Sequence, residues 1–95
     1  MNEVFQALSD PTRREILRLL KNGDMTAGDI AERFPLAKST LSGHFGVLKH
    51  AGLIVAEKNG TRVVYSLNVS AVEEVLASVL SLLDVGRESK KRARI

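Results

Sequence analysis

The sequence contains no cysteine among its 95 residues. This absence excludes disulfide bonds and every metal site built on thiolate ligands. Long apolar runs are also missing, since no stretch approaches the roughly 20 apolar residues that a membrane-spanning helix needs. The first 14 residues include Glu3 and lack the apolar segment of a signal peptide. We therefore expect a soluble protein of the cytoplasm.

An excess of positive charge is lacking everywhere except at the C-terminus. Residues 87–95 carry five Lys/Arg and one acid, a net charge of +4, whereas residues 1–86 carry nine Lys/Arg and ten acids, a net charge of −1. The charge of the chain as a whole therefore does not predict nucleic-acid binding, which must depend on where the charges are placed. We predict one domain over residues 1–86 and a basic, disordered tail over residues 87–95.

The first half of the chain predicts helices. Asp10 and Pro11 suit the N-cap and first position of a helix over about 11–22, after a short apolar segment at 3–8. Thr26 has the capping-box spacing of a short second helix that ends by Pro35. A further helix is expected over about 38–51, and Gly52 terminates it.

The second half begins with a predicted hairpin. Asn59-Gly60, the dipeptide that most favours a type I′ turn, separates two β-rich runs within residues 54–67. Ser70 and Glu73 have the spacing of a capping box for a final helix over about 71–85. The order predicts a mainly α (α+β) fold, a winged helix-turn-helix with about five helices and a two-stranded β-hairpin wing.

The helix at 38–51 has two contrasting faces. Leu41, Phe45 and Leu48 share one face and are predicted to enter the core. The other face is small, polar and then basic, and it contains no acid; its members are Ser39, Ser42, Gly43, Gly46, Lys49 and His50. A solvated helix face normally mixes Glu with Lys, so the lack of acid favours contact with phosphates in a DNA major groove.

Gly43 and Gly46 each cost roughly 1 kcal/mol relative to alanine inside a helix. Two interpretations stay open. Either the DNA approaches this side closely, or both glycines are tolerated weaknesses of a surface helix.

The tip of the hairpin is basic and is interpreted as a second DNA contact, although such tips also serve solubility alone. Thr26 is interpreted either as a phosphate contact or as a plain helix cap. Arg13, Arg14 and Arg18 are interpreted as solvated residues, one of which could touch the DNA backbone. The residues predicted to bind DNA are Thr26, Lys38, Ser39, Thr40, Ser42, Gly43, Gly46, Lys49, Lys58, Asn59, Thr61 and Arg62.

Four segments carry a family resemblance: SDPTRREILRLL, GDMTAGDIAERF, STLSGHFGVLKHAGLI and NGTRVVYSL. Over residues 3–83 the chain resembles the ArsR family of winged-helix repressors, and within it the metal-independent autorepressors of the SdpR type. The resemblance implies a homodimer formed through the first and last helices. The apolar residues at the matching positions are Val4, Phe5, Leu8, Val72, Val75, Leu76, Val79, Leu80 and Leu83. Packing within one chain is the alternative for the last helix.

The chain departs from the family pattern at two positions. Ala37 stands where many members have a capping Ser, which favours a helix start at Ser39, and Gly43 stands where many have His. His44 occupies the family's S-x-H position and is interpreted as structural or adjacent to DNA.

The metal sensors of this family use cysteines beside the recognition helix, or His and acids on the last helix. The last helix here has Glu73, Glu74 and Asp84 but no His. We predict no metal inducer and no cofactor.

We therefore predict a dimeric, sequence-specific transcriptional repressor that binds a pseudo-palindromic operator in double-stranded DNA. No arrangement of residues indicates a catalytic site, so the protein is not predicted to be an enzyme. The signal for release is left open between a partner protein, a small-molecule inducer and the concentration of the repressor itself. Two alternative functions remain, a winged helix that docks a protein and a nucleoid-type binder that depends on Arg87–Arg94.

Overall fold

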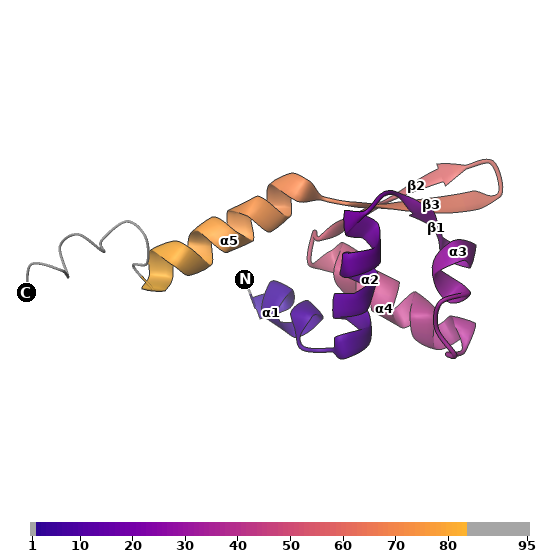
Figure 1. Ribbon diagram of the computed structural model, residues 1–95, viewed down its shortest axis with the longest axis horizontal. Helices are drawn as coiled ribbons and strands as arrows, with labels where there is room; N and C mark the ends of the chain where they lie inside the picture. The colour runs from indigo at the N-terminus through magenta and orange to yellow at the C-terminus, as the bar shows by residue number, and fades with distance from the viewer. Residues whose placement is uncertain (1, 84–95) are drawn as a thin grey trace, which may run out of the picture.

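The computed structural model describes residues 2–83, which form five helices and a small sheet that lies at one edge of the molecule (Figure 1). The predicted tail at 87–95 and the last two residues of the predicted helix 71–85 lie outside the described residues. In chain order the elements are α1 (Asn2–Leu8), α2 (Pro11–Lys21), β1 (Met25–Thr26), α3 (Ala27–Ala31), α4 (Lys38–His50), β2 (Ile54–Asn59), β3 (Arg62–Leu67) and α5 (Val69–Leu83).

The sheet has three antiparallel strands in the order β1-β3-β2, one more than predicted. Met25 lies opposite Tyr65 and Thr26 opposite Val64. β1 therefore pairs with the edge of β3 that faces away from β2, just before α3 begins. A strand of two residues has no alternation to detect, which is why the sequence did not indicate it. The pairing fixes the N-terminal end of α3 beside the wing.

The hairpin turn lies one residue later than predicted. Asn59 pairs with Arg62, which leaves Gly60 and Thr61 as the two-residue loop. Gly60 has a φ of +68°. A two-residue loop with glycine at its first position is a standard hairpin connection, because glycine adopts a positive φ at no steric cost. Asn59 therefore ends β2 and is not a central turn residue.

Most of the predicted helix ends are confirmed. The side chain of Asp10 accepts a hydrogen bond from the backbone N–H of Arg13 at 3.1 Å, and that of Thr26 accepts one from Asp29 at 3.0 Å. The α-helical part of α3 ends at Ala31, four residues before Pro35. α4 begins at Lys38 and not at Ser39, although Ala37 supplies no side-chain cap.

Gly52 closes α4 in the expected way. Its φ is +79°, and its N–H bonds to the carbonyl of Lys49 while the N–H of Leu53 bonds to that of Leu48. This pair of bonds is a Schellman motif, which favours glycine at its left-handed position. Leu53 is thereby turned into the core, where it is buried.

The cap of α5 was predicted wrongly. α5 starts at Val69, and Asn68, not Ser70, caps it: its Oδ1 accepts from the N–H of Ala71 at 3.2 Å. The Nδ2 of Asn68 also donates to the carbonyl of Gly52 at 3.1 Å. Asn68 therefore ties the start of α5 to the end of α4, a contact across 16 residues that a local capping pattern does not reveal.

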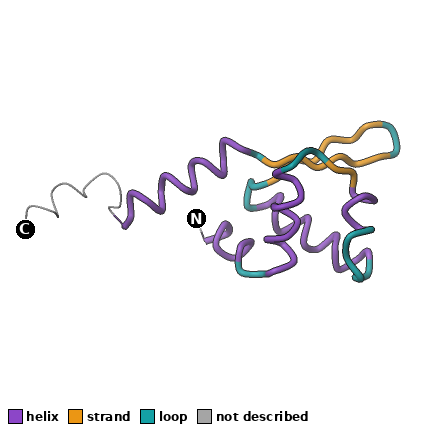
Figure 2. Tube along the Cα trace, viewed as in Figure 1, coloured by secondary structure: helices purple, strands orange, loops and turns teal. Residues whose placement is uncertain are grey.

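The core lies among α1, α2, α3, α4 and the sheet. Its largest fully buried side chains are Ile16, Ile30, Leu41 and Leu48. The rings of Phe45 and Tyr65 lie 4.5 Å apart and join α4 to β3. By contrast α5 contributes no buried residue and extends away from the other helices on the side opposite the hairpin (Figure 2).

Candidate nucleic-acid interface

The two faces of α4 separate as predicted. Leu41, Phe45 and Leu48 are each at most 5% exposed and fill the core. The predicted DNA-contact residues of this helix are all exposed; they are Lys38, Ser39, Thr40, Ser42, Gly43, Gly46 and Lys49. Because residues 38–50 contain no Asp or Glu, this surface carries positive charge only. We call it the α4 face.

The glycines of the α4 face are not required by packing within the chain. A Cβ added at Gly43 or at Gly46 would meet nothing within 4 Å. Alanine would therefore fit at either position and would favour the helix by about 1 kcal/mol. Both interpretations of these glycines stay open, but crowding inside the protein is excluded as their cause.

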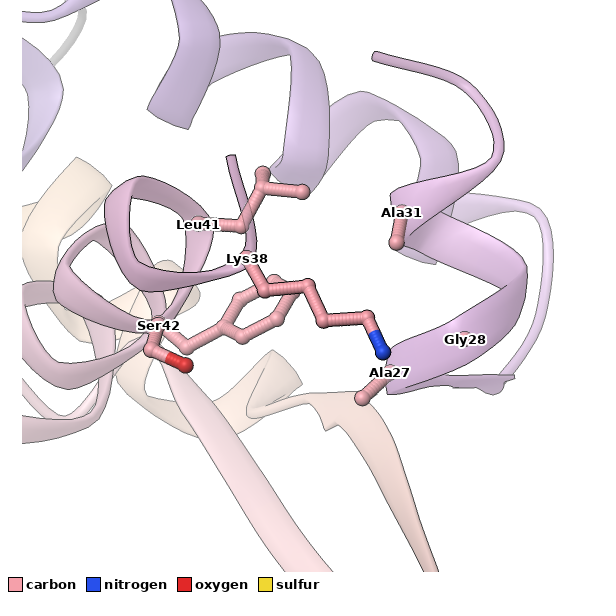
Figure 3. A pocket seen from close by; sticks show the side chains of 7 residues that line it. Ala27, Gly28, Ala31, Lys38, Leu41 and Ser42 are labelled. Carbon is pink, nitrogen blue, oxygen red and sulfur yellow. The ribbon is translucent and has the colours of Figure 1, made fainter. Parts of the chain in front are cut away.

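A cavity of about 230 Å³ separates α3 from the first two turns of α4. Apolar groups form most of it, and Lys38 extends across it toward Ala27 and Gly28 (Figure 3). The lining residues are Ala27, Gly28, Ala31, Lys38, Leu41, Ser42 and Phe45. Lys38 thus keeps its apolar stem over the cavity and its amine at the surface, as long basic side chains commonly do.

The wing lies next to this cavity. Thr26, Thr61 and Arg62 line a second hollow, and Ala27 and Gly28 belong to both hollows. A continuous surface therefore runs from α4 across the start of α3 to the hairpin tip. Lys58 and Asn59 are exposed on that hairpin.

Acids break the positive character of this surface at one place. Asp29 and Glu32 line the second hollow together with Arg62. Phosphate contact is therefore favoured at α4 and at the hairpin tip more than in the hollow between them.

Arg13 is not a simple solvated residue. Its Nε donates to the carbonyl of Ala7 at 2.8 Å and its Nη2 to that of Gln6 at 2.9 Å. Its Nη1 lies 3.1 Å from Nδ1 of His44 in α4. The guanidinium of this α2 residue therefore joins α1 to α4.

Arg14 and Arg18 also have partners. Nη1 of Arg14 donates to the carbonyl of Leu8 at 2.8 Å, and Arg18 pairs with Glu15 on the surface of α2. α1 has no basic residue in its last turn, and the final carbonyls of any helix need outside donors. That need is the signal that could have identified Arg13 and Arg14 as capping residues from the sequence.

The ring of His44 has a polar neighbour at each of its nitrogens, Arg13 at Nδ1 and Asp10 at Nε2. Its Nε2 lies 3.9 Å from Oδ2 of Asp10, and its side chain is 15% exposed. Asp10 accepts the backbone N–H of Arg13, which lowers the pKa of the carboxyl, and the charge of the Arg13 side chain lowers it further. Of the two interpretations of His44, the structural one agrees with these contacts.

The residues predicted to form the dimer contact divide into two groups. Val4 is buried, and Leu8, Val72, Val75 and Val79 are half-buried. Phe5, Leu76, Leu80 and Leu83 are exposed, with Leu76 at 58%. Single exposed apolar residues are normal, but a row of them along one helix is a candidate interaction surface.

Among residues 2–83, no group of three or more His, Cys, Asp or Glu side chains lies together in the manner of a metal site. No helix in the same range has both the length and the apolar character needed to span a membrane.

The helix pair α3–α4, the hairpin beside it and the exposed α4 face together define a winged helix-turn-helix protein. Residues 8–56 match the family described as "Helix-turn-helix domain". The chain is 48% identical over 86 residues to "Transcriptional repressor SdpR" of Bacillus subtilis, an alignment that covers 90% of this chain and 96% of that protein.

Solved structures agree with this likeness. An "ArsR family transcriptional regulator" is 33% identical with a TM-score of 0.72, over 88% of this chain and 90% of its own. An "ArsR-like Transcriptional Regulator" from Rhodococcus sp. RHA1 is 29% identical with a TM-score of 0.78. The superposition covers 97% of this chain and 86% of that chain. The chain belongs to the ArsR family of winged helix-turn-helix transcriptional regulators.

Proposed function

We propose that the protein is a homodimeric transcriptional repressor that binds a pseudo-palindromic operator in double-stranded DNA. The observation that carries the proposal is the α4 face, which is exposed, free of acid and placed on the second helix of a helix-turn-helix unit. A helix in this position lies in the major groove, and its polar side chains reach base edges while flanking cations meet phosphates. A relative of nearly equal length is a transcriptional repressor.

The exposed apolar row of α5 supports the dimer. Leu76, Leu80 and Leu83 are each more than 40% exposed, and Phe5 of α1 is 48% exposed. Burying such side chains against a second copy is worth about 25 cal/mol per Å² of apolar surface. A two-fold dimer would present two α4 faces to successive major grooves about 34 Å apart, and an operator with inverted half-sites would match it.

Selection of bound duplexes from random DNA at physiological salt tests the proposal. We expect an enriched motif made of two inverted half-sites. Enrichment of no motif would contradict sequence-specific repression and would leave either protein docking or general DNA packaging as the function. Removal of residues 87–95 distinguishes a repressor from a general DNA-packaging protein. A repressor keeps its preference for the selected motif without these residues, whereas a nucleoid-type binder loses nearly all of its affinity for DNA.

The salt dependence of binding tests the α4 face itself. Lys49→Ala should reduce affinity for the selected duplex and lower the slope of log affinity against log salt by about one, because one phosphate contact is lost. Lys21→Ala is the matched control, since Lys21 is also an exposed lysine in the last turn of a helix, at the end of α2. Equal slopes for the two variants would place the DNA on another surface.

A further inference from the structure

The guanidinium of Arg13 connects three helices. Its Nε and Nη2 form one edge of the fork and meet the last carbonyls of α1, those of Ala7 and Gln6. Its Nη1 meets His44 of α4. α1 belongs to the proposed dimer contact and α4 to the proposed DNA contact. One side chain of α2 therefore sits between the two functional surfaces.

The chemistry of this contact fixes the state of the His44 ring. An arginine side chain carries only donors and stays protonated, so Nδ1 of His44 must accept. The ring proton is then on Nε2, which faces the carboxylate of Asp10 at 3.9 Å. The two ring nitrogens thus face Arg13 of α2 and Asp10, the N-cap of α2, so both neighbours of the ring belong to the N-terminal end of α2. A hydrogen bond at Nδ1 restrains the rotation of α4 relative to that end.

We propose that Arg13 and His44 are positioning residues that hold the recognition helix α4 at a set place relative to the dimer helix α1. We call the pair the Arg13–His44 clamp. The inference rests on the proposed function, because the separation of two α4 faces matters only in a dimer on paired half-sites. The clamp touches no DNA in this account. It sets the spacing at which both half-sites are engaged together.

Two substitutions of His44 test the clamp, because each places its amide group near the position of a different ring nitrogen. His44→Asn places an amide oxygen near the position of Nδ1 and can still accept from Arg13, whereas His44→Gln places its polar group near the position of Nε2. The clamp therefore predicts that His44→Asn is less damaging than His44→Gln. Helix propensity favours Gln over Asn, so an effect of helix stability alone would make His44→Asn the more damaging of the two.

The measurement is affinity for two duplexes, one with both half-sites of the selected motif and one with a single half-site. Wild-type protein and His44→Asn should share the same preference for the paired duplex. In His44→Gln and Arg13→Ala the preference for the paired duplex should fall roughly tenfold while the affinity for the single half-site is kept, because both variants lose the charge-assisted hydrogen bond between Arg13 and His44. Arg13→Ala also loses the two bonds to the carbonyls of α1. Thermal unfolding of each variant confirms that the folded protein is being compared.

Three outcomes would overturn the clamp. An equal loss on both duplexes would mean that His44 contacts DNA or supports the fold only. A preference unchanged in His44→Gln and Arg13→Ala would mean that the contact positions nothing. If the wild-type protein itself selects no motif, the proposed function fails, and the role of the clamp fails with it.

Discussion

α4 and α5 are helices of similar length that differ in the chemistry of their exposed surfaces, which is polar on α4 and apolar on α5. α4 buries Leu41, Phe45 and Leu48 and exposes a polar face without acid. α5 buries no residue and exposes Leu76, Leu80 and Leu83. Neither surface is the one expected for a helix that faces only solvent. Acidic residues on the α4 face and polar residues in place of the leucines of α5 would both improve solubility. The contrast supports the proposal of two partners with different chemistry, a polyanion for α4 and an apolar surface for α5.

The strongest test of this comparison places charge in the apolar row of α5. Leu76→Lys combined with Leu80→Lys should convert the protein to a monomer, because two ammonium groups cannot be buried unpaired in an apolar contact. The affinity for a paired operator should then fall by about 100-fold or more, since the second half-site is no longer engaged by the same particle. Sedimentation equilibrium and DNA titration measure the two effects.

Ser81→Lys is the control for this experiment. Ser81 is exposed on the side of α5 opposite the apolar row, so its substitution adds the same kind of charge without entering the proposed contact. A monomeric wild-type protein, or a double variant that stays dimeric, would show that another molecule covers α5.

A second test compares leucines from the two helices. Leu48 is 0% exposed and Leu82 is 78% exposed. Leu48→Ala should lower the free energy of unfolding by about 2–5 kcal/mol through lost burial and the cavity left behind. Leu82→Ala should change it by no more than about 0.5 kcal/mol, as is usual for surface substitutions.

Urea denaturation measures both leucine variants at equal protein concentration. A large loss from Leu82→Ala would place this side chain inside a contact that is itself needed for folding. The boundary between domain core and dimer surface would then lie elsewhere on α5.

Local patterns predicted the helices and their faces well, because apolar spacing and caps such as Asp10 and Thr26 act over three or four residues. The errors arose where distant residues decide the structure. β1 exists because Met25 meets Tyr65, and Asn68 replaces Ser70 as the cap of α5 because it also bonds to Gly52.

In the candidate site, too, features that depend on local sequence could be predicted and features that depend on distant residues could not. The α4 face could be predicted from the sequence of one helix. The partners of Arg13 could not, because His44 lies 31 residues away and only the packing of α2 on α4 brings the two together. The position of the turn at Gly60 and Thr61 was missed for a related reason, since the register of β2 on β3 depends on burial along both strands.

The smallest expected effect concerns the glycines of α4. Gly43→Ala and Gly46→Ala should each raise the free energy of unfolding by about 1 kcal/mol, because the added methyl meets no atom of the chain and alanine favours the helix. If the DNA approaches the α4 face closely, the same methyl groups should weaken binding to the selected operator even though the protein is more stable. Urea denaturation and DNA titration of each variant separate the two effects. Unchanged or tighter binding together with higher stability would show that both glycines are tolerated weaknesses of the helix and that the DNA lies farther from this side.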